Sequence, residues 1–132
     1  MIYVCDTHAF IWWATQKRPL GAKASRAFRR AERGLDEIRL PAAAAFEIAL
    51  LLERGRLRSR LGWDDWLDAL RSTRNFAVEP LVLDDVAHAR DMKPLVDPFD
   101  RLITATARRL GAPLITSDER IVDSRLVEIA WR

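Results

Sequence analysis

The chain begins with a short apolar run at residues 2–5, which favours β-structure and does not alternate between apolar and polar positions. Such a run is typical of a strand that is buried on both faces of a parallel sheet. Further strands are predicted at residues 37–40, 113–116 and 126–131, with an extended stretch at 76–83. The expected strands are therefore spread over the whole chain.

Helical patterns fill the segments between these strands. Helices are predicted over residues 7–15, 22–33, 42–54, 64–74, 84–91 and 99–110. Gly34, Gly55 and Gly111 follow three of them, at the position where a left-handed residue commonly ends a helix. The alternation of strands and helices predicts an α/β fold with three layers, in which helices flank a mainly parallel central sheet.

Length and composition narrow the class of protein. The 132 residues amount to one domain, and 49% hydrophobic against 31% charged residues is an ordinary globular mixture. No segment approaches the roughly 20 apolar residues of a membrane helix, so we expect a soluble, cytoplasmic protein. Cys5 is the only cysteine, which excludes an internal disulfide and a cysteine-rich zinc site.

Two aspartates follow predicted strands. Asp6 comes directly after the first strand, and Asp118 comes after Leu114-Ile115-Thr116-Ser117. In open α/β sheets, ligands collect at the carboxyl ends of strands, so both positions are expected of a binding site. Each aspartate also has a structural interpretation, because Asp6 can cap the following helix and Asp118 can cap a turn over residues 119–123.

Glu47 interrupts an apolar stretch in the interior of a predicted helix. The residues three and four positions away are Ala43, Ala44, Leu50 and Leu51, so this carboxylate lies on an apolar stripe. A carboxylate there is costly unless it is paired or binds a metal. The alternative is a side chain at the edge of the stripe that extends outward to solvent.

Asp100 lies in the motif Asp-Pro-Phe-Asp at residues 97–100, where a helix is expected to begin. Asp97 has the better cap position, which leaves Asp100 at the third helical position. There its negative charge interacts favourably with the helix dipole, whether or not it also binds a metal.

The acids Asp6, Glu47, Asp100 and Asp118 come from four separate segments, which one cleft could gather. Crowded carboxylates repel one another unless a cation lies between them, and an all-oxygen site suits Mg²⁺ or Mn²⁺ rather than zinc. Divalent ions held by carboxylates activate water for attack on phosphorus, so the expected substrate carries phosphate. The sequence contains no P-loop, GxGxxG or GxSxG motif that would indicate another chemistry.

The chain resembles the VapC-type PIN-domain ribonucleases of type II toxin–antitoxin systems. The resemblance rests on Asp-Thr-His-Ala-Phe-Ile-Trp-Trp at 6–13, Phe-Glu-Ile-Ala at 46–49, Gly-Arg-Leu at 55–57, Asp-Pro-Phe-Asp-Arg-Leu-Ile at 97–103 and Leu-Ile-Thr-Ser-Asp at 114–118. These motifs cover nearly the whole chain and are specific in combination. Relatives often carry a histidine or basic residue just before Asp-Pro-Phe-Asp, where this chain has Leu95 and Val96.

The resemblance implies that Asp6, Glu47, Asp100 and Asp118 form a metal-binding and catalytic quartet, with Thr116 in the accompanying hydroxyl position. It implies a Mg²⁺-dependent endoribonuclease, with Mn²⁺ as a substitute ion, that leaves a 5′-phosphate and a 3′-hydroxyl. The implied partners are RNA, a VapB-like antitoxin and a second copy of the chain in a homodimer. The alternatives are a PIN-type nuclease for RNA processing or DNA, and a non-catalytic nucleic-acid-binding module in which the acids are caps and surface charges.

Positive charge and aromatic residues allow two interpretations each. The chain has 22 Lys and Arg residues against 19 Asp and Glu, and four arginines lie close together: Arg54, Arg56, Arg58 and Arg60. They either steer RNA toward the acids or form a solvated loop beside a helix end. Most of the five tryptophans are expected to pack in the core or an interface rather than stack on bases. His8 and His88 are expected to be structural or surface residues.

Overall fold

The computed structural model describes residues 1–57 and 60–132, and its strands form a parallel sheet. The strands are β1 (Ile2–Cys5), β2 (Glu37–Pro41), β3 (Phe76–Glu79) and β4 (Leu114–Ile115), in the spatial order β3-β2-β1-β4. Tyr3 of β1 lies opposite Ile38 of β2, and Val4 lies opposite Leu114 of β4. The pairing of β2 with β3 is also parallel, as the sequence of β1 predicted for the sheet.

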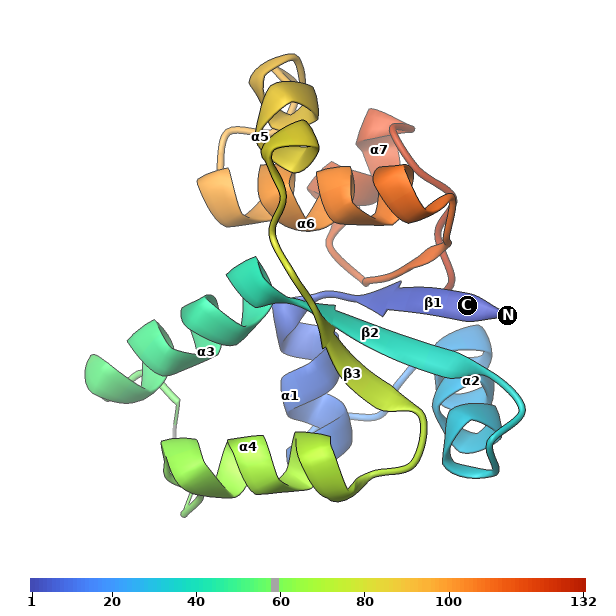
Figure 1. The fold of residues 1–132 in the computed structure, drawn as a ribbon, viewed down its shortest axis with the longest axis vertical. Coiled ribbons are helices and arrows are strands. Elements are labelled where there is room, and N and C mark those ends of the chain that lie inside the picture. Colours follow the sequence, from blue (N-terminus) through green and yellow to red (C-terminus); the bar gives the residue numbers. More distant parts are fainter. Residues whose placement is uncertain (58–59) are drawn as a thin grey trace.

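Helices cover both faces of this sheet (Figure 1). On one face lie α1 (Thr7–Thr15), α2 (Ala22–Glu32) and α4 (Trp63–Ser72), and on the other lie α5 (Leu83–Arg90), α6 (Pro98–Leu110) and α7 (Glu119–Ser124). α3 (Ala42–Glu53) continues directly from β2 and projects beyond the carboxyl end of the sheet. The three-layer α/β/α fold predicted from the sequence is therefore confirmed.

Packing on both faces fixes the strands between the helices. Val4, Ile38 and Leu114 are fully buried in the middle of the sheet. On the face that carries α1 and α2, the ring of Trp13 lies 5.4 Å from Phe28 and 4.6 Å from Phe76. Burial of this kind is the main source of folding free energy, so the ends of β1 and β4 are held in defined positions.

The structure corrects the prediction for the C-terminal tail. The strand predicted at residues 126–131 is wrong, because in the described part of the chain it is reduced to a bridge between Ile129 and Leu114. Backbone hydrogen bonds still hold the tail beside β4, from Leu114 N–H to the Glu128 oxygen at 2.8 Å and from Ala130 N–H to the Leu114 oxygen at 2.9 Å. The two residues of β4 offer only a short edge for such pairing.

The helix boundaries differ little from prediction, apart from one additional helix. The residues after Asp118 form α7, where the sequence predicted only a turn. The other helices begin and end within two residues of the predicted bounds. Among the described residues, no helix has both the length and the apolar character that a membrane span requires.

The end of the chain is tied to the start of α2. The backbone N–H groups of Lys23 and Ala24 donate to the Trp131 oxygen at 3.1 and 3.2 Å. A Cβ on Gly21 would lie only 2.1 Å from that oxygen, so this close approach requires glycine. The contact places the Trp131 ring edge-on to Trp12, with 5.9 Å between the ring centroids.

Candidate active site

The connections of the sheet change sides between the neighbouring strands β1 and β4. The chain leaves β1 through α1 and α2 on one face, and it reaches β4 through α5 and α6 on the other face. The carboxyl ends of two such strands frame a crevice, which is where open α/β sheets bind ligands. Asp6 directly follows β1, and Asp118 follows β4 after Thr116 and Ser117.

Asp6 caps a helix and lines a pocket at the same time. Its Oδ1 accepts a hydrogen bond of 2.8 Å from the N–H of Ala9, in the first turn of α1. The side chain is only 8% exposed, and the buried hydroxyl of Thr116 also forms a hydrogen bond with it. The capping bond therefore fixes the Asp6 carboxylate at the end of β1.

Asp118 is held in a similar way at the end of β4. Its Oδ1 accepts a hydrogen bond of 2.9 Å from the N–H of Arg120 and caps α7. The N–H of Asp118 donates to the Thr116 hydroxyl at 3.0 Å, so Thr116 contacts both strand-end aspartates. The Arg120 guanidinium lies 3.4 Å from the same carboxylate but is largely exposed, so this ion pair contributes little stability.

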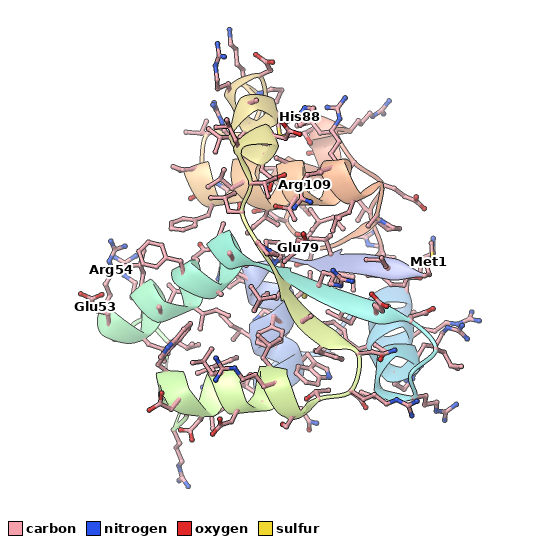
Figure 2. All side chains as sticks on the ribbon, in the orientation of Figure 1. Met1, Glu53, Arg54, Glu79, His88 and Arg109 are labelled. Carbon is pink, nitrogen blue, oxygen red and sulfur yellow. The ribbon has the colours of Figure 1, made fainter. Side chains whose placement is uncertain are left out.

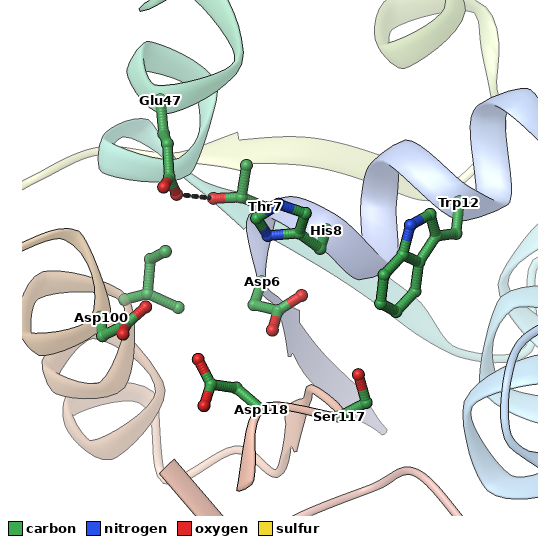
Figure 3. A pocket seen from close by; sticks show the side chains of 9 residues that line it. Asp6, Thr7, His8, Trp12, Glu47, Asp100, Ser117 and Asp118 are labelled. Carbon is green, nitrogen blue, oxygen red and sulfur yellow. Dashed lines mark hydrogen bonds between the residues drawn. The ribbon is translucent and has the colours of Figure 1, made fainter. Parts of the chain in front are cut away.

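Glu47 extends from α3 into the same crevice rather than outward to solvent (Figure 3). Its Oε1 accepts a hydrogen bond of 2.5 Å from the hydroxyl of Thr7, the first residue of α1. Ala43 and Ala44 of the predicted apolar stripe are buried, whereas Leu50 and Leu51 are half-buried. The carboxylate is therefore oriented by a residue 40 positions away in sequence.

Asp100 occupies the third position of α6, as predicted. Asp97 is the N-cap, and its Oδ1 accepts a hydrogen bond of 3.1 Å from the Asp100 N–H. Pro98 begins the helix, where its missing N–H has no intrahelical partner to lose. Because Asp97 provides the cap, the Asp100 carboxylate does not have this role, and it lines the pocket at the ends of β1 and β4.

A pocket of about 170 Å³ joins these side chains (Figure 3). It is lined by Asp6, Thr7, His8, Trp12, Glu47, Asp100, Ile103, Ser117 and Asp118. The four acids singled out in the sequence thus meet in one place, whereas Thr116 lies buried behind two of them. Within residues 1–57 and 60–132, no three histidine, cysteine or acidic side chains already converge as a metal-binding group.

Burial and crowding raise the pKa of two of these acids. Burial raises the pKa of Asp6 from 3.8 to about 6, partly opposed by hydrogen bonds from Thr116 and Ala9. Burial and, to a lesser extent, the negative charges nearby together raise the pKa of Asp100 from 3.8 to about 7. The pocket therefore binds protons near neutral pH, which is the expected behaviour of clustered carboxylates without a cation.

Arg54, Arg56 and Arg60, which were expected either to steer RNA or to form a solvated loop, do not line this pocket. Arg54 is the C-terminal cap of α3, and Figure 2 shows it at the far end of that helix. Arg56 and Arg60 are exposed, and Arg58 lies outside the described residues. A role of these arginines in RNA binding stays a prediction.

Sequence reasoning missed four polar or aromatic residues of the pocket. Thr7 and Ser117 directly adjoin Asp6 and Asp118 in sequence, a signal that could have identified them. His8 was expected to be structural or at the surface; it is exposed, and its charge lowers the pKa of Asp6. Packing in the core or an interface was expected for most of the five tryptophans, and Trp12 borders the acids.

Comparison with known proteins establishes the family. The model of the PIN domain matches residues 3–125. Ribonuclease VapC22 of Mycobacterium tuberculosis is 33% identical to the chain over 121 residues, which cover 91% of this chain and 89% of that protein. The chain therefore belongs to the PIN-domain family and, within it, to the VapC-type ribonucleases, as its motifs indicated.

Solved structures show the same fold. The chain in the VapBC2 structure from Rickettsia felis, bound to a promoter DNA fragment, matches with a TM-score of 0.73, 13% identity and full coverage of both chains. VapC20 of Mycobacterium tuberculosis, described as a sarcin–ricin loop cleaving toxin, matches with a TM-score of 0.68 and 19% identity over 98% of this chain and 99% of that one. At such identities the likeness supports the fold alone.

Proposed function

We propose that the chain is a Mg²⁺-dependent endoribonuclease toxin that hydrolyses RNA phosphodiester bonds at the acidic pocket. The observation that carries the proposal is the meeting of Asp6, Glu47, Asp100 and Asp118 at the carboxyl ends of β1 and β4. Similarity to Ribonuclease VapC22 supports RNA as the substrate class.

The donors in the pocket suit a hard divalent cation. The carboxylates of Asp6, Glu47, Asp100 and Asp118 would hold it, and oxygen is the ligand that Mg²⁺ and Mn²⁺ prefer. The raised pKa values of Asp6 and Asp100 support this assignment, because a cation relieves the repulsion among the carboxylates. The four carboxylates line different walls, so binding requires side-chain rotations toward a common point. When bound, the ion supplies an activated water and stabilises charge on the phosphate.

Hydroxyl groups orient the carboxylates before any ligand enters. Thr7 donates to Glu47, and Thr116 contacts both Asp6 and the backbone of Asp118. Residues that orient metal ligands in this manner commonly affect metal affinity and activity by about 10- to 100-fold. We therefore assign Thr7 and Thr116 positioning roles in the proposed site.

We extend the proposal to a VapB-like antitoxin. Two of the similar structures are named as VapBC proteins, VapBC2 from Rickettsia felis and VapBC-1 from nontypeable Haemophilus influenzae. A lysine or arginine presented by an amphipathic helix of the antitoxin would pair with the pocket acids and compete with the metal. A homodimer, as the family resemblance implies, and a cytoplasmic location complete the proposal.

The proposed activity is tested with single-stranded RNA and the purified chain. We expect cleavage with Mg²⁺ or Mn²⁺, none with EDTA, and products that carry a 5′-phosphate and a 3′-hydroxyl. Glu47→Gln should lose activity and carboxylate-dependent Mg²⁺ binding in calorimetry. Glu53→Gln is the matched control, because Glu53 lies on the same helix, is exposed and does not line the pocket. Cleavage that persists in EDTA, or in Glu47→Gln, would refute the proposed mechanism.

A further inference from the structure

The side of the acidic pocket opposite Glu47 and Asp100 is aromatic. Figure 3 shows the Trp12 indole there, across Asp6 from Glu47 and Asp100. Unpaired nucleobases stack on indole rings. Carboxylates, in contrast, bind a phosphate only when a cation lies between them. The same pocket thus offers a surface for a base next to the proposed site of phosphate chemistry.

Arg18 places a positive charge against the Trp12 ring. Its guanidinium carbon lies 4.5 Å from the centroid of the Trp12 ring, and the side chain is exposed. A guanidinium on an indole is held by the electrons of the ring, and its N–H groups are suitable donors to a phosphate. Trp12 and Arg18 together therefore present the two chemistries that one nucleotide requires.

The Trp12 ring also packs against other rings of the chain. Trp131 lies edge-on to it at 64°, and the backbone oxygen of Trp131 is anchored by Lys23 and Ala24 of α2. The His8 ring lies 6.0 Å away on the same helix. A ring held in place before the ligand arrives loses little conformational entropy when a base stacks on it.

Trp12 differs from its neighbour in ways that argue against a purely structural role. Trp13 stacks on Phe28 at 9° between the ring planes, and its Nε1–H donates to Glu32 at 2.9 Å. Both features tie Trp13 to α2. Trp12 and Trp13 are both half-buried, but Trp12 borders the acidic pocket and Trp13 does not.

We propose that Trp12 and Arg18 form a nucleotide subsite beside the acidic pocket, in which the indole stacks on one unpaired base of single-stranded RNA and Arg18 contacts an adjacent phosphate. The inference rests on the proposed ribonuclease function and adds a substrate contact to it. Bases inside a duplex are already stacked on their neighbours, so the subsite selects single-stranded RNA. Its loss raises KM and leaves kcat unchanged, because it touches no reacting atom.

The test compares the effects on RNA binding of a substitution at Trp12 and of one abasic position in the RNA, each alone and both together. Asp6→Asn serves as the non-cleaving parent, and anisotropy of a labelled single-stranded RNA gives Kd in the presence of Mg²⁺. We expect one abasic position to weaken binding by about 5- to 100-fold in the parent, and to have no further effect once Trp12→Leu is added. Trp12→Phe should retain most of this coupling, which separates stacking from a folding defect.

Matched controls come from α4, away from the pocket. Trp63→Leu removes another exposed indole, and Arg71→Gln removes another exposed arginine. Neither should change the abasic pattern, whereas Arg18→Gln should lower the slope of log Kd against log salt by about one phosphate contact. Equal abasic penalties in the parent and in Trp12→Leu would overturn the subsite. Cleavage by the wild-type chain without this coupling refutes the subsite alone, and coupling without cleavage refutes the proposed activity alone.

Discussion

The carboxyl end of the sheet brings acids together in two regions with opposite surroundings. Near β2 and β3, Glu79 and the fully buried Asp85 are matched by arginines. The Arg109 guanidinium lies 2.7 Å from Asp85 and 3.1 Å from Glu79, and Arg39 lies 2.9 Å from Glu79. Glu79 and Arg109 are labelled in Figure 2. Arginines of the same chain neutralise these acids, and the resulting ion pairs link β2, β3, α5 and α6.

The pocket at β1 and β4 is organised differently. Its carboxylates are oriented by backbone N–H groups and hydroxyls, and the nearby Arg120 is exposed. Burial is the largest cause that raises the pKa of Asp6 to about 6 and that of Asp100 to about 7, and the charge of Asp118 adds to the rise in both. Acids of the first region therefore stabilise the fold through ion pairs with arginines of the same chain. Acids of the second region lack such buried partners, so protons or a bound cation neutralise them.

The largest expected effect is loss of activity on Asp6→Asn. The amide retains the shape of the side chain and its capping bond to Ala9, but removes the charge expected to hold the metal. We expect RNA cleavage to fall by more than about 100-fold with no decrease in Tm. Asp91→Asn, at the exposed end of α5, is the control and should cleave normally. Normal cleavage and metal binding by Asp6→Asn would remove the pocket from consideration as the active site.

Arg109→Leu should have the next largest effect, on stability rather than on chemistry. The substitution leaves Asp85 and Glu79 buried without this partner, which costs about 3 kcal/mol in the free energy of unfolding. The exposed neighbour Arg108 is the matched control, and Arg108→Leu should change stability by less than about 0.5 kcal/mol. Urea unfolding measures both variants. Equal stability of the two would show that the paired region does not hold the fold together.

Stabilisation by Mg²⁺ should depend on pH. Asp6 and Asp100 have raised pKa values of about 6 and 7, so at pH 5.5 the metal has to displace protons from both. We expect the apparent Mg²⁺ affinity to be at least about tenfold higher at pH 8, and Mg²⁺ to raise Tm more at that pH. Thermal unfolding with and without Mg²⁺ at pH 5.5 and pH 8 measures this difference. An equal shift in Tm at both pH values would contradict a clustered site.

The smallest expected effect is the change in folding stability when one acid is neutralised, and it has opposite signs in the two regions. Because the pKa of Asp100 is higher in the folded chain, its contribution to stability is fully present below about pH 4 and is lost as the pH rises through 7. In metal-free protein at pH 8, Asp100→Asn should therefore stabilise the fold by about 1 kcal/mol, a figure reduced for partial exposure. Glu79→Gln should destabilise it at the same pH, since it weakens ion pairs with Arg39 and Arg109. The free energy of unfolding of both variants, measured in EDTA at pH 8, tests this prediction. A loss of stability in both variants would mean that the pocket acids are structural.

The sequence determined the local elements and the local place of each acid. The unalternating run before Asp6 predicted a buried parallel strand, and the motif at residues 97–100 predicted both the cap and the third helical position of α6. Glu47 was identified by its apolar surroundings, which reflect the burial of α3. These inferences succeeded because hydrophobic periodicity and capping act over a few residues.

Only the tertiary structure decided which distant groups meet. Nothing in the sequence joins Thr7 to Glu47 or Arg109 to Asp85, yet these contacts span 40 and 24 positions. The same is true of the aromatic side of the pocket, because Trp12 has the same local pattern as the packed Trp13. Long-range contacts depend on the order of the strands and on the packing of helices against them, so a side chain's partners are fixed only when the layers assemble.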